Sequence, residues 1–346
     1  MRVVEPLLKA TEATGAMREM HLDARKLAMV VSAEGGNLED ALRQLEPLIS
    51  ATEQVCGPNH YKVFELLQTR QAIFFNLGRY KEALPIAEQL IARETAALGR
   101  NHPITMLTRK EHSLLLATLG ELQRAEQLSR ELIADSEKVQ GPLHFNTLIL
   151  KRTLGGQLWQ QKRYAEAEPL VRQTYADLKT ALGEDDSATI DAMNTLALVL
   201  EDMGNPGEAE TLYLRMVEIH DRVPFPDTPD TLSKFNNLAY LYMNQQQFPK
   251  AEGMFSNLVE RSRKGLGEAH PVYWQYVGNL GLCQFKAKKL DAAQQHLEQA
   301  YENLVKISGN EFRLSQVMAK RLNKLYYERG LKAEAKAISA KILPGK

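Results

Sequence analysis

Alanine recurs every 42 residues along this chain, eight times and without an insertion or deletion. The series is Ala41, Ala83, Ala125, Ala167, Ala209, Ala251, Ala293 and Ala335. Glycine keeps the same spacing in two further columns, one beginning at Gly15 and the other at Gly36. A repeat of this kind predicts small structural units that stack in a line, each in contact only with its neighbours. Such an array needs no single large hydrophobic core.

Each unit is predicted to contain two helices. One glycine column separates successive units, and the other separates a first helix, helix A, from a second, helix B. In the fifth unit Ile190, Met193 and Ala197 form an apolar stripe on helix A, and Ala209 and Met216 form one on helix B. Two helices with one apolar stripe each cannot bury themselves alone, so stacking on the next pair is required.

The linkers carry the signals of helix ends. Pro103 suits a first helical turn, where the missing N–H costs nothing, and so does Pro271. Gly99 and Gly267 suit a helix C-terminus that needs a positive φ. The histidines in linker register are predicted to cap helices; they are His60, His102, His144 and His270.

The alanine column has a predicted packing role. A small side chain on helix B lets helix A of the same unit approach closely, and a bulky replacement would overpack the pair by roughly 1–3 kcal/mol. Small residues also recur opposite the alanines on helix A, at Ser113, Gly155, Ala197, Ala239 and Gly281.

These patterns resemble the tetratricopeptide repeat family. The segments GRYKEA (78–83), KRYAEAE (162–168) and FNNLA (235–239) are similar to its signature. The linkers LGRNHP (98–103) and LGEAHP (266–271) resemble its kinesin light chain subtype, which is common in bacterial regulatory and scaffold proteins. The resemblance implies an all-α fold: a right-handed superhelical solenoid of about eight antiparallel helix pairs, with a concave face that binds a protein or peptide.

Residues 16–346 are predicted to form one solenoid domain. Its repeats are 16–57, 58–99, 100–141, 142–183, 184–225, 226–267, 268–309 and 310–346. Residues 1–15 are predicted to be an additional half-repeat helix, because VEPLLKATE (4–12) closely copies LEPLISATE (45–53) of the first helix B. We expect either a solenoid capped by a lone half-repeat or a part of a longer protein.

Three places depart from the family pattern. Arg70–Gln71 and His112–Ser113 stand where the family usually has leucine followed by a small residue, so the A helices of repeats two and three are expected to pack less regularly. The linker 223–229 contains three prolines and is expected to be stiff, with a changed superhelical pitch.

Composition argues against several function classes. The 43 basic and 43 acidic residues give no net charge, which argues against a protein that wraps nucleic acid or coats an anionic membrane. Cys56 and Cys283 stand far apart, so neither a disulfide framework nor a zinc site is indicated. No run resembles a signal peptide or a membrane span, and we expect a cytoplasmic protein.

We also expect no enzymatic activity, no cofactor and no metal. The sequence has no Cys-x-x-Cys or His-x-x-x-His pair, no Gly-x-Ser-x-Gly motif and no phosphate-binding loop after a strand. Adjacent carboxylates such as Asp185 and Asp186 are interpreted as ordinary solvated groups.

The resemblance places ligand contacts on the A helices. Fifteen residues before each alanine, the chain changes from mostly basic to amide: Lys26, Gln68, Lys110, Arg152, Asn194, Asn236, Gly278 and Lys320. The predicted peptide-binding residues are Lys26, Arg109, Lys110, Arg152, Trp159, Asn194, Asn236, Asn237, Tyr240 and Asn279. The asparagines can bind the backbone of an extended peptide. The basic residues of the first half can meet acidic side chains or a carboxylate, as in the carboxylate clamps of chaperone-binding relatives.

A second interpretation of these residues stays open. Isolated cations on helices are usually solvated, and some of these are expected to pair with Glu65 or Asp23. Aromatic residues at helical spacing, such as Phe75 and Phe285, are more often core than ligand contacts.

Three functions compete. The leading hypothesis is a scaffold that holds a segment of a partner protein, with acidic residues favoured by the basic half. The second is a sensor or regulatory arm of a larger signalling protein, such as a transcription regulator, a kinase or a STAND-type ATPase. The third is nucleic-acid binding along the ridge from Arg25 to Arg152, against which the zero net charge argues. No oligomeric state is predicted.

Overall fold

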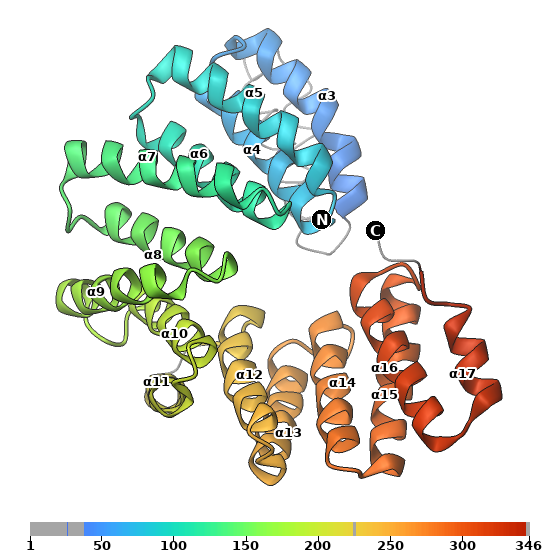
Figure 1. The fold of residues 1–346 in the computed structure, drawn as a ribbon. Coiled ribbons are helices and arrows are strands. Elements are labelled where there is room, and N and C mark those ends of the chain that lie inside the picture. Colours follow the sequence, from blue (N-terminus) through green and yellow to red (C-terminus); the bar gives the residue numbers. More distant parts are fainter. Residues whose placement is uncertain (1–25, 27–37, 224–225, 344–346) are drawn as a thin grey trace. The chain divides into compact units, whose positions relative to one another are not determined.

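The structure, a computed structural model, describes residue 26, residues 38–223 and residues 226–343. Its described residues form fifteen helices and no strand (Figure 1). The A helices are α4 (Tyr61–Asn76), α6 (Pro103–Thr118), α8 (Phe145–Gln160), α10 (Ser187–Asp202), α12 (Pro229–Asn244), α14 (Pro271–Lys286) and α16 (Arg313–Arg329). The B helices are α3 (Leu38–Cys56), α5 (Tyr80–Leu98), α7 (Leu122–Gln140), α9 (Tyr164–Leu182), α11 (Pro206–Arg222), α13 (Phe248–Gly265), α15 (Leu290–Ser308) and α17 (Lys332–Ser339).

The chain divides into two compact units, residues 1–177 and residues 178–346. Within each unit, helices that follow one another along the chain pack together, as α4 does on α5 and α12 on α13. A helices of successive repeats also contact each other, α6 with α8 in unit 1 and α14 with α16 in unit 2. The predicted all-α array of stacked helix pairs is confirmed. The predicted half-repeat at residues 1–15 lies outside the described residues.

In repeats two to eight, the alanine column lies at the contact between the two helices of the repeat. All eight alanines are 0% exposed. The small residues opposite them are equally constrained: a Cβ at Gly155 would lie 2.2 Å from Cγ2 of Val171, and one at Gly281 would lie 3.2 Å from the carbonyl oxygen of Ala293. Helix A and helix B therefore approach as closely as the sequence predicts, because no larger side chain fits between them.

The predicted histidine caps are present at the start of four A helices. Nδ1 of His60, His102, His144 and His270 accepts a hydrogen bond from the backbone N–H two residues later, at 3.2–3.4 Å. Asp186 and Thr228 cap α10 and α12 at the equivalent position of the period. Each cap satisfies a backbone donor that the first helical turn leaves unbonded.

In repeats two to eight, the turn between helix A and helix B has a left-handed backbone. Glycine supplies it at Gly78, Gly120, Gly204 and Gly330, with φ between 72° and 84°. The three repeats that lack this glycine keep the same turn, with φ of 59° at Lys162, 60° at Gln246 and 62° at Lys288. These are the only non-glycine residues of positive φ in the described part of the chain. The packing of the helix pairs thus imposes the left-handed turn, and these three residues adopt it despite its conformational cost.

Replacing Gln246 by glycine is expected to stabilise the protein by about 0.5–1 kcal/mol. The left-handed conformation costs a residue with a Cβ about 1–2 kcal/mol, and part of this gain is lost because glycine has more freedom in the unfolded chain. Urea unfolding measures the change. Gln246→Ala is the matched control, because alanine removes the side chain but keeps the strain. Equal stability of the two variants would contradict the interpretation.

Gln71 and His112 place polar groups in the core and leave the helices that carry them unchanged in length. Helices α4 and α6 both keep the 16 residues found in α8 and α10. His112 is 9% exposed, its Nε2 is buried without a hydrogen-bond partner among the described residues, and burial lowers its pKa. The neighbouring Ser113 accepts a hydrogen bond from Gln157 at 2.6 Å. The departures from the family pattern therefore place polar groups in the interior of unit 1.

No helix among the described residues has both the length and the apolar composition needed to span a membrane.

Candidate functional site

In unit 2, the four predicted asparagines are joined by side-chain hydrogen bonds between successive A helices. Asn237 Nδ2 on α12 donates to Asn194 Oδ1 on α10 at 2.9 Å. Asn279 Nδ2 on α14 donates to Asn236 Oδ1 on α12 at 2.8 Å. Both pairs are 43 residues apart, so the contact recurs with the period of the array. We call Asn194, Asn236, Asn237 and Asn279 the amide row.

Tyr240 and Arg321 extend the amide row towards α16. The Tyr240 hydroxyl donates to Asn279 Oδ1 at 3.0 Å, and Arg321 Nη1 donates to the same oxygen at 2.9 Å. Arg321 Nη2 donates to the Tyr240 oxygen at 3.1 Å. Tyr240 was predicted from the sequence, and Arg321 was not. The available signal was its position, 42 residues after Asn279 in the column that also contains Asn237.

The row combines neutral hydrogen-bonding groups with one cation. Asn279 is 1% exposed, whereas the other asparagines, Tyr240 and Arg321 are half-buried. Within the described ranges, no carboxylate forms an ion pair with the Arg321 guanidinium, which donates to the neutral oxygens of Asn279 and Tyr240 and to the Met318 sulfur. Guanidinium groups bind carboxylates in a planar, bidentate geometry. The row can thus offer amide groups to a peptide backbone and a positive charge to an acidic group.

The predicted basic residues of unit 1 differ in their environments. Lys26 pairs with Glu65 of α4 at 2.5 Å, one of the two partners expected from the sequence. Lys110 on α6 is half-buried beside Glu111, whose pKa is raised by burial. Arg152 occupies the equivalent position on α8 and is half-buried, as is Trp159 two turns further along that helix. Lys110 and Arg152 therefore remain the candidates for positive charge on this face of unit 1.

The structure corrects the role predicted for Arg109. This residue is 3% exposed, and its Nη1 donates to Asp135 Oδ2 of α7 at 2.8 Å, with Glu131 3.8 Å from Nη2. Successive residues of an α-helix point in directions about 100° apart. Arg109 therefore faces α7, the B helix of its own repeat, and the next residue, Lys110, faces a different direction. Arg109 therefore holds α6 against α7 and is not available to a ligand.

A buried glutamate lies between α4, α5 and α6. Glu94 is 0% exposed, and its Oε1 accepts hydrogen bonds from Gln68 Nε2 at 3.2 Å and from Thr108 Oγ1 at 3.1 Å. Its second oxygen has no hydrogen-bond partner in the described part of the protein. Burial raises the pKa of Glu94 to about 7, although both hydrogen bonds act in the opposite direction. Gln68 was predicted only as a member of the column fifteen residues before each alanine, and Glu94 was not predicted from the sequence.

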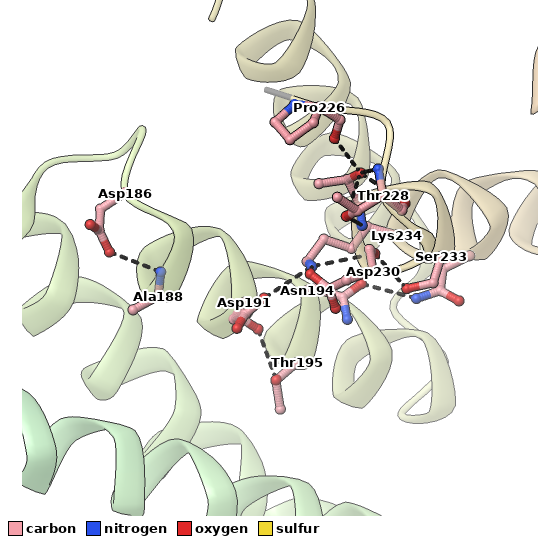
Figure 2. Close-up of polar contacts among 12 residues, drawn as sticks. Asp186, Ala188, Asp191, Asn194, Thr195, Pro226, Thr228, Asp230, Ser233 and Lys234 are labelled. Atoms are coloured by element: carbon pink, nitrogen blue, oxygen red, sulfur yellow. Dashed lines mark hydrogen bonds and ion pairs between the residues drawn. The ribbon is translucent and has the colours of Figure 1, made fainter. Parts of the chain in front are cut away.

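A buried lysine lies beside the start of the amide row (Figure 2). Lys234 on α12 is 6% exposed, and its ammonium contacts Asp191 of α10 at 3.0 Å and Asp230 of its own helix. Asp191 lies one turn before Asn194 on α10, so the lysine cluster and the amide row are neighbours. Lys234 was not predicted as a site residue, although it occupies a column that is apolar in most repeats.

The described residues contain no arrangement that suggests metal or nucleophilic chemistry. No group of three or more histidine, cysteine, aspartate or glutamate side chains in this part of the chain is placed to hold a metal ion. Cys283 is buried, and burial raises the pKa of its thiol to about 11, so the reactive thiolate is disfavoured.

Models of one family match the sequence. Two models, both described as tetratricopeptide repeat, match residues 145–222 and 230–304 in one case and residues 72–104 in the other, together more than half of the chain. No curated protein matches the sequence.

Solved structures share the fold at low sequence identity. One of them consists of kinesin light chain repeats from Podosopora anserina that are nearly identical to one another. Its sequence is 22% identical to this chain, its TM-score is 0.52, and the match covers 60% of this chain and 98% of its own. A tetratricopeptide repeat protein from Parabacteroides merdae is 18% identical, with a TM-score of 0.53, over 88% of this chain and 98% of its own. A STAND protein with a tetratricopeptide repeat sensor from Pyrococcus horikoshii is 11% identical, with a TM-score of 0.58, over 98% of this chain and 50% of its own.

Proposed function

Because this chain belongs to the tetratricopeptide repeat family, we propose that it is a scaffold that holds an extended segment of a partner protein against its A helices. The observation that supports this most directly is the amide row. Its asparagines come from three successive A helices and are linked at the period of the repeat. We propose no catalytic step for this surface.

The amide row suits the backbone of a peptide rather than particular side chains. Asn194, Asn236 and Asn237 each use one polar group of the amide in the bonds between the asparagines and keep the other for a ligand. Asn279 is 1% exposed and uses both of its groups, so it positions its neighbours instead. An extended peptide presents alternating N–H and C=O groups, which asparagine can match as both donor and acceptor. A row that binds in this way tolerates variation in the side chains of its ligand.

Positive charge on the same helices supports a preference for acidic segments or a terminal carboxylate. In unit 2 this charge comes from Arg321, held by Asn279 and Tyr240. In unit 1 the proposal rests on Lys110 and Arg152, which are half-buried at equivalent positions of α6 and α8. The acidic preference is therefore proposed to be strongest where Arg321 meets the amide row.

Peptide selection followed by calorimetry tests this function. Random peptides displayed on phage are selected on the whole chain, and the enriched peptides are titrated against the wild type and two variants. We expect Asn236→Ala to weaken binding about tenfold, because a hydrogen bond to a backbone group contributes about 1 kcal/mol and the loss also frees Asn279 Nδ2. Arg321→Gln is expected to weaken the binding of acidic peptides about tenfold, and the effect should be smaller at high salt.

Gln295→Ala is the matched control, since it removes an exposed amide from a B helix of the same unit. Enriched peptides that bind Asn236→Ala and Arg321→Gln as tightly as the wild type would exclude the amide row as the binding surface. Oligonucleotides that bind more tightly than any peptide, with a steep salt dependence, would instead favour the nucleic-acid alternative.

A further inference from the structure

A cavity of about 400 Å³ lies between α5, α6 and α7 of unit 1. Buried residues of α6 form its floor, and its rim comes from α5, α7 and the linker before α6. Ile91, Leu116 and Leu128 give it an apolar surface. Cavities of about 300–1,000 Å³ with apolar walls and a few polar groups are typical of ligand sites. This cavity therefore has the size and the lining of a site for a small group.

The charged side chains of the lining are already paired. They form three ion pairs at 2.8–3.3 Å: Glu88 with Arg124, Glu131 with Arg100, and Arg109 with Asp135. A charged ligand would have to displace a partner from one of these pairs, and it would meet groups of its own sign whether it were an anion or a cation. The lining therefore favours a neutral ligand.

One buried polar atom of the floor makes no hydrogen bond. His112 is 9% exposed, and its Nε2 has no hydrogen-bond partner among the described residues. The Glu88 carboxylate lies 4.0 Å from this nitrogen, which is too far for a hydrogen bond. Burial lowers the pKa of His112, so the imidazole is neutral near pH 7. A buried polar atom without a partner costs stability, and a ligand that bonds to it removes that cost.

Leucine occupies the position of His112 in the five repeats that follow. These leucines are 0–6% exposed: Leu154, Leu196, Leu238, Leu280 and Leu322. An equivalent cavity of about 410 Å³ lies one repeat later, between α7, α8 and α9, with Leu154 in its lining. Among the residues described there, no polar side-chain atom of the lining is buried without a hydrogen bond. The packing of a repeat thus does not require His112, and residues that break a local rule in this way often mark functional sites.

We propose that the cavity between α5, α6 and α7 binds the side chain of a tyrosine from a partner protein. The phenol hydroxyl would form a hydrogen bond with Nε2 of His112, and it suits either tautomer of the imidazole because a hydroxyl both donates and accepts. The ring would pack on the apolar residues of the cavity, and a phenol carries no charge at neutral pH. Arg100 and Arg124 at the rim favour an aromatic ring over an aliphatic chain, because guanidinium groups are attracted to its face.

This site lies in unit 1 and shares no residue with the amide row, so it adds a second kind of contact to the proposed function. Methyl NMR of the whole chain measures binding at both cavities in one experiment. Isoleucine methyl groups are labelled, because Ile91 lines the first cavity and Ile133 lines the equivalent one. The probes are N-acetyl-tyrosine amide and N-acetyl-phenylalanine amide, which differ only in the hydroxyl.

We expect saturable shifts of the Ile91 methyl groups at millimolar concentrations of the tyrosine probe, with the phenylalanine probe bound about tenfold more weakly. Ile133 should show no preference between the two probes, because its cavity has leucine at the position of the histidine.

His112→Leu is expected to abolish the preference, so that both probes bind with equal affinity. The variant should fold normally, because leucine stands at this position in five other repeats. The site is refuted if the tyrosine probe causes no saturable shift of Ile91, if the phenylalanine probe binds equally well, or if His112→Leu keeps the preference. Asn236→Ala and Arg321→Gln test the amide row of unit 2 separately, so failure of this site would leave the proposed function standing.

Discussion

Glu94→Gln is expected to stabilise unit 1 by about 3 kcal/mol at pH 8 and by less than about 1 kcal/mol at pH 5. Burial raises the pKa of Glu94 to about 7, above the ordinary value of 4.5. Folding of the wild type at pH 8 must therefore bury a carboxylate whose second oxygen has no hydrogen-bond partner in the described residues. Glutamine resembles the protonated acid in shape and carries no charge to desolvate.

The sign of this pH dependence follows from proton binding. Between pH 4.5 and about 7 the folded state keeps a proton on Glu94 that the unfolded state has released, so stability falls as pH rises through this range. Below it both states are protonated and the cost disappears. Above it the cost is constant, at about 1.4 kcal/mol for each pH unit that separates the two pKa values.

Urea unfolding between pH 5 and pH 8, with hydrogen exchange of α4–α6 as the local readout, measures this difference. Other groups titrate in the same range, so the quantity of interest is the difference between variant and wild type at each pH. Glu88→Gln is the matched control, because this glutamate lies on the same helix with about half of its side chain exposed. Parallel pH profiles for Glu94→Gln and the wild type would show that Glu94 is ionised in the folded protein at pH 5.

Phe255→Ala is expected to destabilise unit 2 by about 3–5 kcal/mol, the usual cost of removing a buried phenylalanine. Phe255 is 0% exposed on α13, and its ring packs edge-on against Tyr240 with the centroids 5.5 Å apart. The variant also removes the support of the tyrosine that donates to Asn279. We therefore expect peptide binding at the amide row to weaken at temperatures where the variant is still folded.

Thermal and urea unfolding, together with calorimetric titration of an enriched peptide, check both effects. Phe255→Leu should cost less than Phe255→Ala, because it keeps most of the buried volume. Phe75→Ala should cost little, since this phenylalanine is 38% exposed. If Phe255→Ala binds peptide with unchanged affinity, the packing of Tyr240 does not position the amide row.

Much of the fold follows from the period and from the residue types that keep it. The alanines, the histidine caps and the prolines at the first helical turn are all local or periodic signals, and they predicted the positions of the described helices. The left-handed turns could not all be predicted from residue identity, because three of them lack glycine. Lys162, Gln246 and Lys288 adopt the glycine conformation because the repeats on either side require it.

The candidate site was predicted less completely, because a column of residues does not specify what each side chain contacts. The asparagines were predicted one by one as contacts for a peptide, and the structure shows them bonded to one another. Arg321 was missed because its role depends on Asn279 and Tyr240 of other repeats. Arg109 was misplaced because one residue of helical rotation turns it from the ligand-binding face towards α7.

The sequence by itself determined the repeat, the two helices of each unit and the close contact at the alanines, because these depend on spacing and side-chain size. The tertiary structure alone decided which polar residues are buried, and with which partners. Glu94, Lys234 and Arg321 owe their properties to side chains on neighbouring helices, 14 to 81 residues away. Burial and pairing of charge are set by the stacking of whole repeats, and no single repeat contains that information.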